Sequence, residues 1–474
     1  MLLRLAVTGT LVALSAGCHS GPLAQVPTLA AVQRVTAPEG SVRLVGWPRA
    51  MADAERALWA DKVKALTRSH PLPDTSVLVF ADENSARTAS ERLQQEAGVR
   101  WVSLNHRRHL GLLEEPRLPS PVVRNLQTFS DLLTGSGGQW HLALSKVTSA
   151  WENFPRARGQ DILVGVLDSG VDYRHPDLAL NIARDEAGLP IKIDALGMAG
   201  RVDSCLGLDY SADSAYRDTN HPGPDGNGHG THVAGIIAAV ANNLTGLKAN
   251  VVGVAPEARI VDIKAMDCEG GGTDDVIAVG IRRAVDLGVR VLNMSIGGEE
   301  PAPILAEAIA YGQARGVLFV VAAGNGSGVP VYYPAAYPGV VAVGALDTRG
   351  RRASYSNVGS ELAVMAPGGG INQTAEGILS TLPTYEHVLS AGRTQGSWPG
   401  HGRVSGTSQA SPVVAGVAAL LLSQEPTLSP DQVRLRLLAS SKDMGSNGFD
   451  KDTGWGMVDA AAALAMGQRG GERP

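Results

Sequence analysis

Four continuous apolar runs, separated by stretches of helical pattern, constrain the fold of this chain most. The runs are DILVGVLD (161–168), ARIVDIKAMD (258–267), VRVLNMS (289–295) and VLFVVAAGN (317–325). Such runs are typical of strands buried on both faces of a parallel sheet. Helical patterns cover Asp274–Leu287 and Pro303–Arg315, and Gly288 and Gly316 follow them as expected C-terminal stops. We therefore predict an α/β fold with a parallel sheet and helices on both of its faces.

The chain divides into a leading part and a larger α/β domain at residues 139–466. Residues 75–110 form a small α+β unit with a strand, helix, strand pattern in which Asp82 can cap the helix. Residues 18–74 are interpreted as a tether or lead-in, and residues 111–138 as a linker rich in Pro and Gly. Residues 467–474 are expected to be a flexible tail.

Charge and the first residues bear on partners and location. The formal net charge of -5 gives no basic field for nucleic acid, so we exclude that class of partner. Residues 1–17 combine one cation, an apolar run and small residues, which predicts an export signal. The signal resembles those of bacterial lipoproteins, in which Cys18 would be lipidated and anchor the protein at the membrane, in the periplasm or at the cell surface. Ordinary cleavage, which releases a soluble secreted protein, is the alternative.

Four polar side chains stand at the ends of predicted elements. Asp168 ends the first strand, Asn325 ends the fourth, and His229 opens a helix in GNGHGTHVAG. Ser408 lies in GTSQASP, just before an apolar helix. Because proline fits the first turn of a helix, Pro412 predicts that this helix begins near Ser408. Free N–H groups at a helix start favour negative charge.

These residue types are the parts that acyl transfer needs. A serine hydroxyl becomes a strong nucleophile only when a base takes its proton. An imidazole base needs a carboxylate to fix its tautomer and stabilise its cation. The tetrahedral intermediate carries an oxyanion, to which the backbone N–H of Ser408 and the side-chain amide of Asn325 could donate. With a histidine base, activity should rise from acid to neutral pH.

The motifs DSGVDYRHPDL, GHGTHVAG and GTSQASP resemble the three signatures of subtilisin-like serine peptidases, the subtilase family. The order Asp, His, Ser is also that of subtilisin. The resemblance implies a triad of Asp168, His229 and Ser408, an oxyanion hole with Asn325, and a serine endopeptidase that acts on proteins or peptides. It further implies that two chain segments bind an extended peptide by strand addition. One is Ser295, Ile296 and Gly297, and the other is Gly270, Gly271 and Gly272.

The same resemblance implies several further roles. The unit at 75–110 would be a prodomain that blocks the cleft until self-cleavage between about Arg108 and Gly138. Tyr332 stands where subtilisin has a glycine at the specificity pocket. A disulfide between Cys205 and Cys268 and a structural calcium at Asp177 and Asn243 are also expected. No cofactor is required for the chemistry.

Several alternatives stay open. The same triad could transfer the acyl group to an amine, as in a peptide ligase or cyclase, or the fold could be an inactive surface-binding module. Cys205 and Cys268 could be free buried thiols. His229 and His232 lie three residues apart, but no third zinc ligand is evident. The insertion between Asp168 and His229 holds seven aspartates, which could bind calcium or form a solvated loop: Asp185, Asp194, Asp203, Asp209, Asp213, Asp218 and Asp225.

Overall fold

The fold is taken from a computed structural model of the full chain. It describes residues 40–48, 50–96, 98–110, 138–197, 205, 225–241, 251–371, 376–390 and 400–468. The predicted export signal, the predicted lipidation site Cys18, the predicted calcium ligand Asn243, and most of the predicted linker and tail lie outside these residues.

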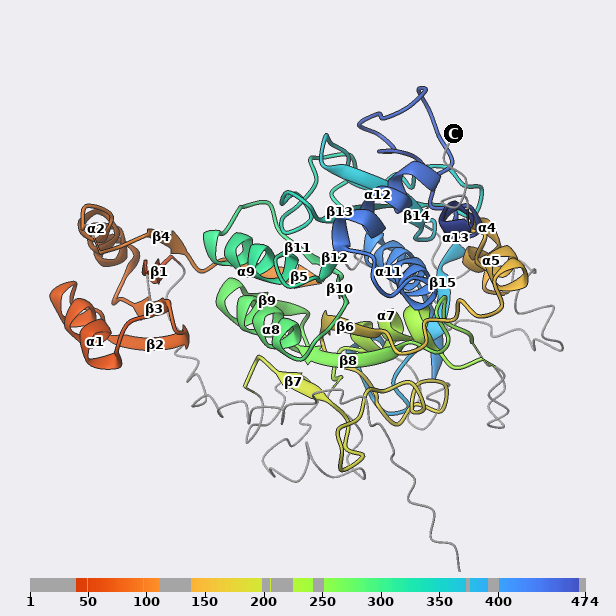
Figure 1. The fold of residues 1–474 in the computed structure, drawn as a ribbon. Coiled ribbons are helices and arrows are strands. Elements are labelled where there is room, and N and C mark those ends of the chain that lie inside the picture. Colours follow the sequence, from red (N-terminus) through yellow and green to blue (C-terminus); the bar gives the residue numbers. More distant parts are fainter. Residues whose placement is uncertain are drawn as a thin grey trace, which may run out of the picture.

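A parallel sheet forms the centre of the larger domain, as the apolar runs predict (Figure 1). Its strand order is β14-β13-β12-β10-β6-β8-β7, and every neighbouring pair is parallel. The strands are β6 Leu163–Asp168, β7 Lys192–Asp194, β8 Arg259–Lys264, β10 Val291–Met294, β12 Leu318–Ala322, β13 Val341–Leu346 and β14 Leu362–Pro367.

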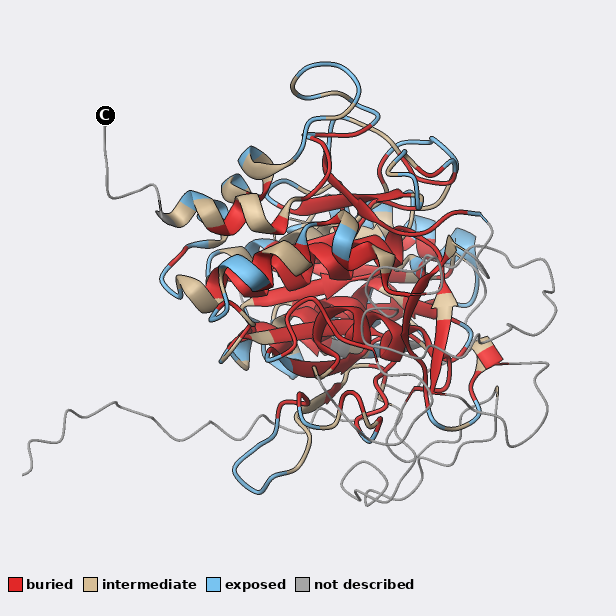
Figure 2. Ribbon diagram, turned by 90° about the vertical axis from the view of Figure 1, so that its right-hand side faces the viewer, coloured by how far each residue is buried: buried red, intermediate tan, exposed pale blue. Residues whose placement is uncertain are grey.

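Helices cover both faces of this sheet. Alternate residues of a strand point to opposite faces, so Val164 and Val166 join one apolar cluster while Leu167 joins the other. One face packs against α5 Val147–Asn153, α7 His229–Ala238, α11 Thr407–Gln424, α12 Pro430–Ser440 and α13 Ala460–Gln468. The other face packs against α8 Asp274–Asp286 and α9 Pro303–Gln313. Figure 2 shows that the sheet and its central helices are almost entirely buried.

Smaller elements complete the larger domain. They are α4 Trp140–Leu144, β9 Gly271–Thr273, β11 Ile296–Gly297, the antiparallel pair β15 Ile378–Thr381 and β16 His401–Val404, and the short 3-10 helix η1 Val388–Ser390. Gly288 and Gly316 adopt the positive φ values expected of helix C-terminal stops, +83° and +86°. No described helix combines the length and the apolar character needed to cross a membrane.

The N-terminal unit begins earlier than the sequence suggested. Residues 42–72, which we expected to belong to a tether, supply β1 Val42–Gly46, α1 Asp53–Lys62 and β2 Thr67–Leu72. They join the predicted strand, helix and strand: β3 Thr75–Val79, α2 Glu83–Gln94 and β4 Trp101–Leu104. The result is an antiparallel sheet of order β2-β3-β1-β4. β1 and β3 are buried along almost their whole length, so neither shows the alternation of a half-buried strand.

The two faces of this small sheet have different neighbours. Val45 and Leu78 pack against α1 and α2 in the unit's own core. Leu44 and Val77 belong to the same apolar cluster as α8 and α9 of the larger domain. Glu307 of α9 accepts hydrogen bonds from Arg100 at 2.6 Å and from the indole of Trp101 at 2.7 Å. The N-terminal unit is therefore docked on the two helices through both apolar and polar contacts.

The buried His141 of α4 is expected to make the stability of the fold fall at acidic pH. Burial, together with the nearby Arg403 and His232, lowers the pKa of His141 to about 3. Neither ring nitrogen has a hydrogen-bond partner among the described residues. The unfolded chain takes up a proton on this ring below about pH 6.5, whereas the folded chain does not, so the stability contributed by the neutral ring is lost as pH falls.

We expect His141→Leu to remove this loss. The stability difference between variant and parent should grow by about 1.4 kcal/mol per pH unit below pH 6.5, which is about 2.7 kcal/mol by pH 4.5. Urea unfolding of both proteins in a Ser408→Ala background, which prevents self-digestion, measures it. A difference that does not change with pH would show that His141 is not a buried neutral ring.

Candidate active site

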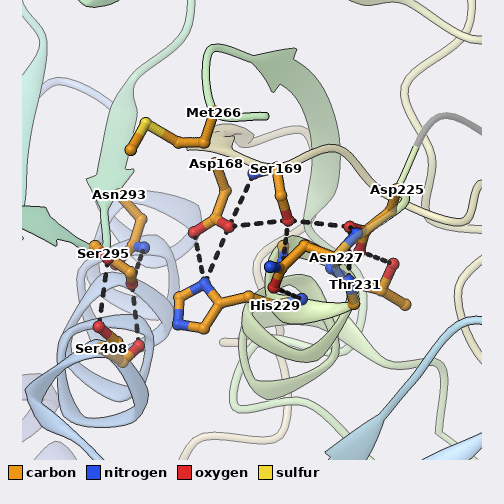
Figure 3. Close-up of polar contacts among 12 residues, drawn as sticks. Asp168, Ser169, Asp225, Asn227, His229, Thr231, Met266, Asn293, Ser295 and Ser408 are labelled. Atoms are coloured by element: carbon orange, nitrogen blue, oxygen red, sulfur yellow. Dashed lines mark hydrogen bonds and ion pairs between the residues drawn. The ribbon is translucent and has the colours of Figure 1, made fainter. Parts of the chain in front are cut away.

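Asp168 and His229 meet where β6 ends and α7 begins (Figure 3). His229 Nδ1 lies 2.9 Å from Asp168 Oδ1 and 3.0 Å from Oδ2, and both side chains are fully buried. Because a carboxylate only accepts, Nδ1 carries the proton and the Nε2 lone pair points away from Asp168. Gly230 permits this approach, since a Cβ there would lie 2.1 Å from the carbonyl oxygen of Gly170.

Ser408 is the second residue of α11, so its N–H is among those that have no partner within the helix. Its Oγ donates to the carbonyl oxygen of Ser295 at 3.2 Å and not to His229 in this conformation. The next residue, Gln409, has its Nε2 3.5 Å from His229 Nε2. The start of α11 therefore lies next to the imidazole, although Ser408 Oγ and His229 Nε2 are not hydrogen-bonded to each other in this conformation. Such bonds often form only when substrate is bound.

Pro412 lies in the second turn of α11 and not in the first, because the helix already begins at Thr407. Proline has no N–H for the carbonyl of Ser408 four residues earlier. The hydroxyl of Ser295 donates to that carbonyl instead, at 2.9 Å. Ser295, which the resemblance placed in the substrate cleft, thus supplies the hydrogen bond that Pro412 cannot give to the Ser408 carbonyl.

Asn325 follows β12 and faces the start of α11. Its Oδ1 accepts from the N–H of Thr407 at 3.0 Å and from the Thr407 hydroxyl at 2.8 Å. Because both Thr407 groups donate, the side-chain atom that they contact must be the oxygen Oδ1, and the NH₂ group points away from Thr407. Asn325 is half-buried, next to the cleft. The two hydrogen bonds thus fix the orientation of the Asn325 side chain at the start of α11.

The two predicted peptide-binding segments flank a strand of the chain itself. The strand is β5 Arg107–Leu110, and the sheet order is β11-β5-β9 with both pairings antiparallel. Leu110 pairs with Ile296, and His109 pairs with both Gly297 and Gly271. The N–H of Leu110 also donates to the carbonyl of Gly270 at 2.9 Å. An extended peptide therefore fits between the two segments.

Tyr332 lies between the peptide-binding edge and the Asn325 loop. A Cβ on Gly297 would come within 3.2 Å of Tyr332 Cβ, and a Cβ on Gly324 within 2.6 Å of its ring. The ring is partly buried, which raises the pKa of its hydroxyl above the usual value. The ring thus packs against the backbone at Gly297 and Gly324.

The structure adds three residues that sequence reasoning missed. Asp225, which we grouped with a calcium-binding or solvated acidic loop, is fully buried. It accepts from the N–H groups of Gly228 and Thr231 at the start of α7, and from the hydroxyl of Ser169. Ser169 in turn donates its N–H to Asp168 Oδ1 at 2.8 Å. Lys264 is buried next to Asp168 and donates to the carbonyl of Ser169.

Local sequence gives no signal that would have separated these residues from their neighbours. Asp225 was one of seven aspartates in one insertion, and only the predicted helix start four residues later hinted at a capping role. Asp185 of the same insertion is exposed and accepts from its own turn. Asp203, Asp209, Asp213 and Asp218 lie outside the described residues.

Two neighbours of Asp177 are N–H donors and not calcium ligands. Asp177 Oδ2 accepts from His401 Nε2 at 2.7 Å and from the N–H of Val251 at 3.2 Å. Calcium needs oxygen ligands, and these two neighbours are N–H donors. Within the described ranges, no group of three or more His, Cys, Asp or Glu side chains could hold a metal. Asn243 lies outside those ranges, so the part of the prediction that involves it stays a prediction.

His232 makes structural contacts. Its Nε2 lies 3.1 Å from the carbonyl of Ile378 and 3.3 Å from that of Gly402, so it joins α7 to β15 and β16. Burial lowers the pKa of His232 to about 3.

The structure also contains the disulfide between Cys205 and Cys268, with a Cα–Cα distance of 6.2 Å. Asn227 donates to the carbonyl of Cys268 at 2.8 Å, so this bridge is connected to the entrance of α7.

Gln409 gives the site an expected resistance to oxidation. It follows Ser408, the predicted nucleophile, at a position where many subtilases have methionine, whose thioether is readily oxidised. Met266, close to Asp168, is fully buried. We expect activity to survive exposure to hydrogen peroxide, and a Gln409→Met variant to lose it under the same conditions. Residual activity measured over time on both proteins tests this, and equally rapid loss of both would contradict it.

Comparison with known proteins yields a consistent set of relatives. Residues 159–456 match the Subtilase family. Subtilisin DY from Bacillus licheniformis is 36% identical over 310 residues, which are 65% of this chain and 92% of that protein. Fervidolysin from Fervidobacterium pennivorans is 37% identical over 340 residues, 69% of this chain and 43% of that protein.

A solved structure of a subtilisin relative is also similar to this chain. The crystal structure of fervidolysin, described as a keratinolytic enzyme related to subtilisin, superimposes with a TM-score of 0.65 at 30% identity. The match covers 90% of this chain and 61% of the fervidolysin chain.

Proposed function

Because the chain belongs to the subtilase family of serine endopeptidases, we propose that Asp168, His229 and Ser408 form its triad and that Asn325 completes its oxyanion hole. His229 Nε2 accepts the proton of Ser408 Oγ as that oxygen bonds to the carbonyl carbon of the substrate. The N–H of Ser408 and the amide of Asn325 donate to the oxyanion. His229 then protonates the leaving amine, and a water molecule, deprotonated by the same nitrogen, hydrolyses the acyl-enzyme.

The contact between Asp168 and His229 carries this proposal. Both carboxylate oxygens lie within 3.0 Å of Nδ1, so the imidazole is held in the tautomer that can act as a base at Nε2. Gln409, the residue after Ser408, reaches to 3.5 Å from that nitrogen. The chemistry needs only these side chains and backbone N–H groups.

Product analysis tests the proposal and separates it from transfer to an amine. A protein substrate is digested in ¹⁸O-labelled water with and without an added peptide amine. Hydrolysis puts one ¹⁸O into each new carboxyl terminus, and the Ser408→Ala variant should give none. Products joined to the amine, without ¹⁸O, would instead identify a peptide ligase. No products from the wild-type chain would support the inactive binding module.

The N-terminal unit is proposed to be a prodomain that inhibits the enzyme. Its strand β5 occupies the position between β9 and β11 that a substrate peptide needs. The unit is also anchored on α9 through Glu307. We propose that self-cleavage within the predicted range, near the end of β5, releases it. The N-terminal residue of the mature protein, determined by mass spectrometry, tests this.

Export is part of the proposal. The disulfide between Cys205 and Cys268 supports an oxidising compartment, because disulfides are rare in the cytosol. Lipidation at Cys18 remains the proposed means of membrane attachment, with a secreted soluble form as the alternative. Metabolic labelling with a radioactive fatty acid distinguishes the two, because only the anchored form would carry the label.

Tyr332 is expected to limit the size of the residue that precedes the scissile bond. Its ring lies against Gly297 and Gly324, so a large side chain would compete for that space. We expect Tyr332→Gly to raise kcat/KM for a peptide with phenylalanine at this position by about 10-fold or more relative to one with alanine. Unchanged preference in the variant would mean that the ring lies outside the specificity pocket.

A further inference from the structure

Arg108 makes a buried ion pair in the middle of the peptide-binding cleft. Its Nε donates to Asp274 Oδ1 at 2.6 Å, and the two side chains are 1% and 0% exposed. Asp274 is the first residue of α8 and directly follows β9, one of the two cleft edges. A buried charge is costly unless it is paired, so this contact needs both partners.

The register of β5 shows which substrate position Arg108 represents. Leu110 lies opposite Ile296, so one step further the peptide reaches Ser295, whose carbonyl accepts from Ser408 Oγ. The residue opposite Ser295 is thus the one next to the nucleophile, P1. Leu110 then takes position P2, His109 takes P3 and Arg108 takes P4.

Only two positions of β5 point into the protein. Arg108 and Leu110 are buried, whereas Arg107 and His109 are exposed, as alternation along a strand requires. Arg107 contacts Asp267 at 3.3 Å and Glu269 at 3.5 Å, but half of its own side chain is exposed, so water screens both contacts. Recognition by charge is therefore concentrated at the position of Arg108.

Asp274 is built to receive a cation at this position. Two groups donate hydrogen bonds to its carboxylate, Arg108 Nε and the N–H of His106, and both belong to the segment that would leave with the N-terminal unit. The neighbouring Asp275, by contrast, keeps the hydroxyl of Thr273 from its own domain at 2.6 Å. Once the N-terminal unit leaves, Asp274 loses both partners. Burial raises its pKa while Arg108 lowers it, so a cationic guest is what favours the charged carboxylate.

The pocket is also shaped for a long side chain. A Cβ on Gly298 would lie 2.7 Å from Arg108 Nη1, so glycine there makes room for the guanidinium. From this geometry we propose that Asp274 selects substrates that carry arginine at P4. The proposal rests on the proposed endopeptidase function and assigns the substrate class of that site.

Quenched fluorescent peptides test the proposal. They share the sequence His-Leu at P3 and P2, carry alanine or phenylalanine at P1, and differ at P4 as arginine, its uncharged isostere citrulline, or norleucine. The full-length chain is allowed to process itself before assay. We expect arginine to exceed citrulline in kcat/KM by about 10- to 100-fold, the range for a hydrogen bond to a charged group.

Two variants complete the experiment. Asp274→Asn should abolish the preference for arginine, so that the variant cleaves the arginine and citrulline peptides at equal rates. Glu307→Gln is the matched control, because it contacts the N-terminal unit but not β5, and it should keep the preference. The comparison of arginine with citrulline uses the wild-type chain, so it does not depend on how a variant folds.

The outcomes separate the two proposals. Equal cleavage of the arginine and citrulline peptides by the wild-type chain would overturn the role of Asp274 and restrict the Arg108 contact to docking of the N-terminal unit. Cleavage of none of the peptides would overturn the endopeptidase function, and this proposal with it.

Discussion

Ser408→Ala and His229→Ala are each expected to lower kcat by about a million-fold, a magnitude measured for subtilisin itself. The reason is that the two groups act as one unit. Without His229 Nε2 the hydroxyl keeps its proton, and without the hydroxyl the imidazole has nothing to activate. The double variant should therefore be no slower than either single variant. Kinetics on a chromogenic peptide measure all three.

Ser423→Ala is the matched control for this prediction. Ser423 lies on the same helix, α11, is partly buried, and donates to the carbonyl of Leu420 far from the cleft. Its replacement should leave kcat within about threefold, the scale of a change that does not touch the site. A further large loss in the double variant would mean that Ser408 and His229 act independently, which contradicts a triad.

Asn325→Leu is expected to lower kcat by about 100- to 1,000-fold with little change in KM, an effect size known from the equivalent donor of subtilisin. The amide donates to an oxyanion that exists only in the transition state, so ground-state binding should be unaffected. Leucine has nearly the shape of asparagine but cannot donate. A loss in KM alone would assign Asn325 to substrate binding instead.

Thr407→Val refines this test. Valine keeps the backbone N–H that donates to Asn325 Oδ1 but removes the hydroxyl that donates to the same atom at 2.8 Å. We expect a smaller loss of kcat, about 10-fold, because the amide is less firmly oriented. In the Asn325→Leu background the same substitution should have almost no effect on kcat. Independent losses would show that Thr407 does not act through Asn325.

The sequence predicted the central sheet because its signal is local. Strands β6, β8, β10 and β12 are buried on both faces, so each is a continuous apolar run that no surface strand would show. The polar residues that end these runs could be found by position alone, since parallel strands place their carboxyl ends at one edge. Asp168 and Asn325 are two such residues.

The N-terminal unit illustrates what local patterns miss. Strand β2 reads TRSHPL, which contains a proline and few apolar residues, and α1 is mostly polar. These segments gain their structure from pairing with β3 and from the core around Trp47 and Phe80. Propensity is only a weak guide where tertiary contacts decide the conformation. A tether was therefore predicted where a folded strand and helix lie.

The contacts that complete the site were also beyond prediction because their partners are distant in sequence. Arg108 and Asp274 are 166 positions apart, and Ser295 and Ser408 are 113 apart. Neither pair follows a spacing rule for helices or strands. From Pro412 one could anticipate that the carbonyl of Ser408 needs another donor. The sequence could not show that this donor is Ser295.

Labelling with a fluorophosphonate probe tests the central claim most directly, because such probes bond only to an activated serine. The mature protein is treated with the probe, digested, and mapped by mass spectrometry. We predict one adduct, on Ser408, that is absent in Ser408→Ala and forms far more slowly in His229→Ala. Folded protein that gives no adduct, or an adduct on another serine with Ser408 unmodified, would contradict the proposed triad.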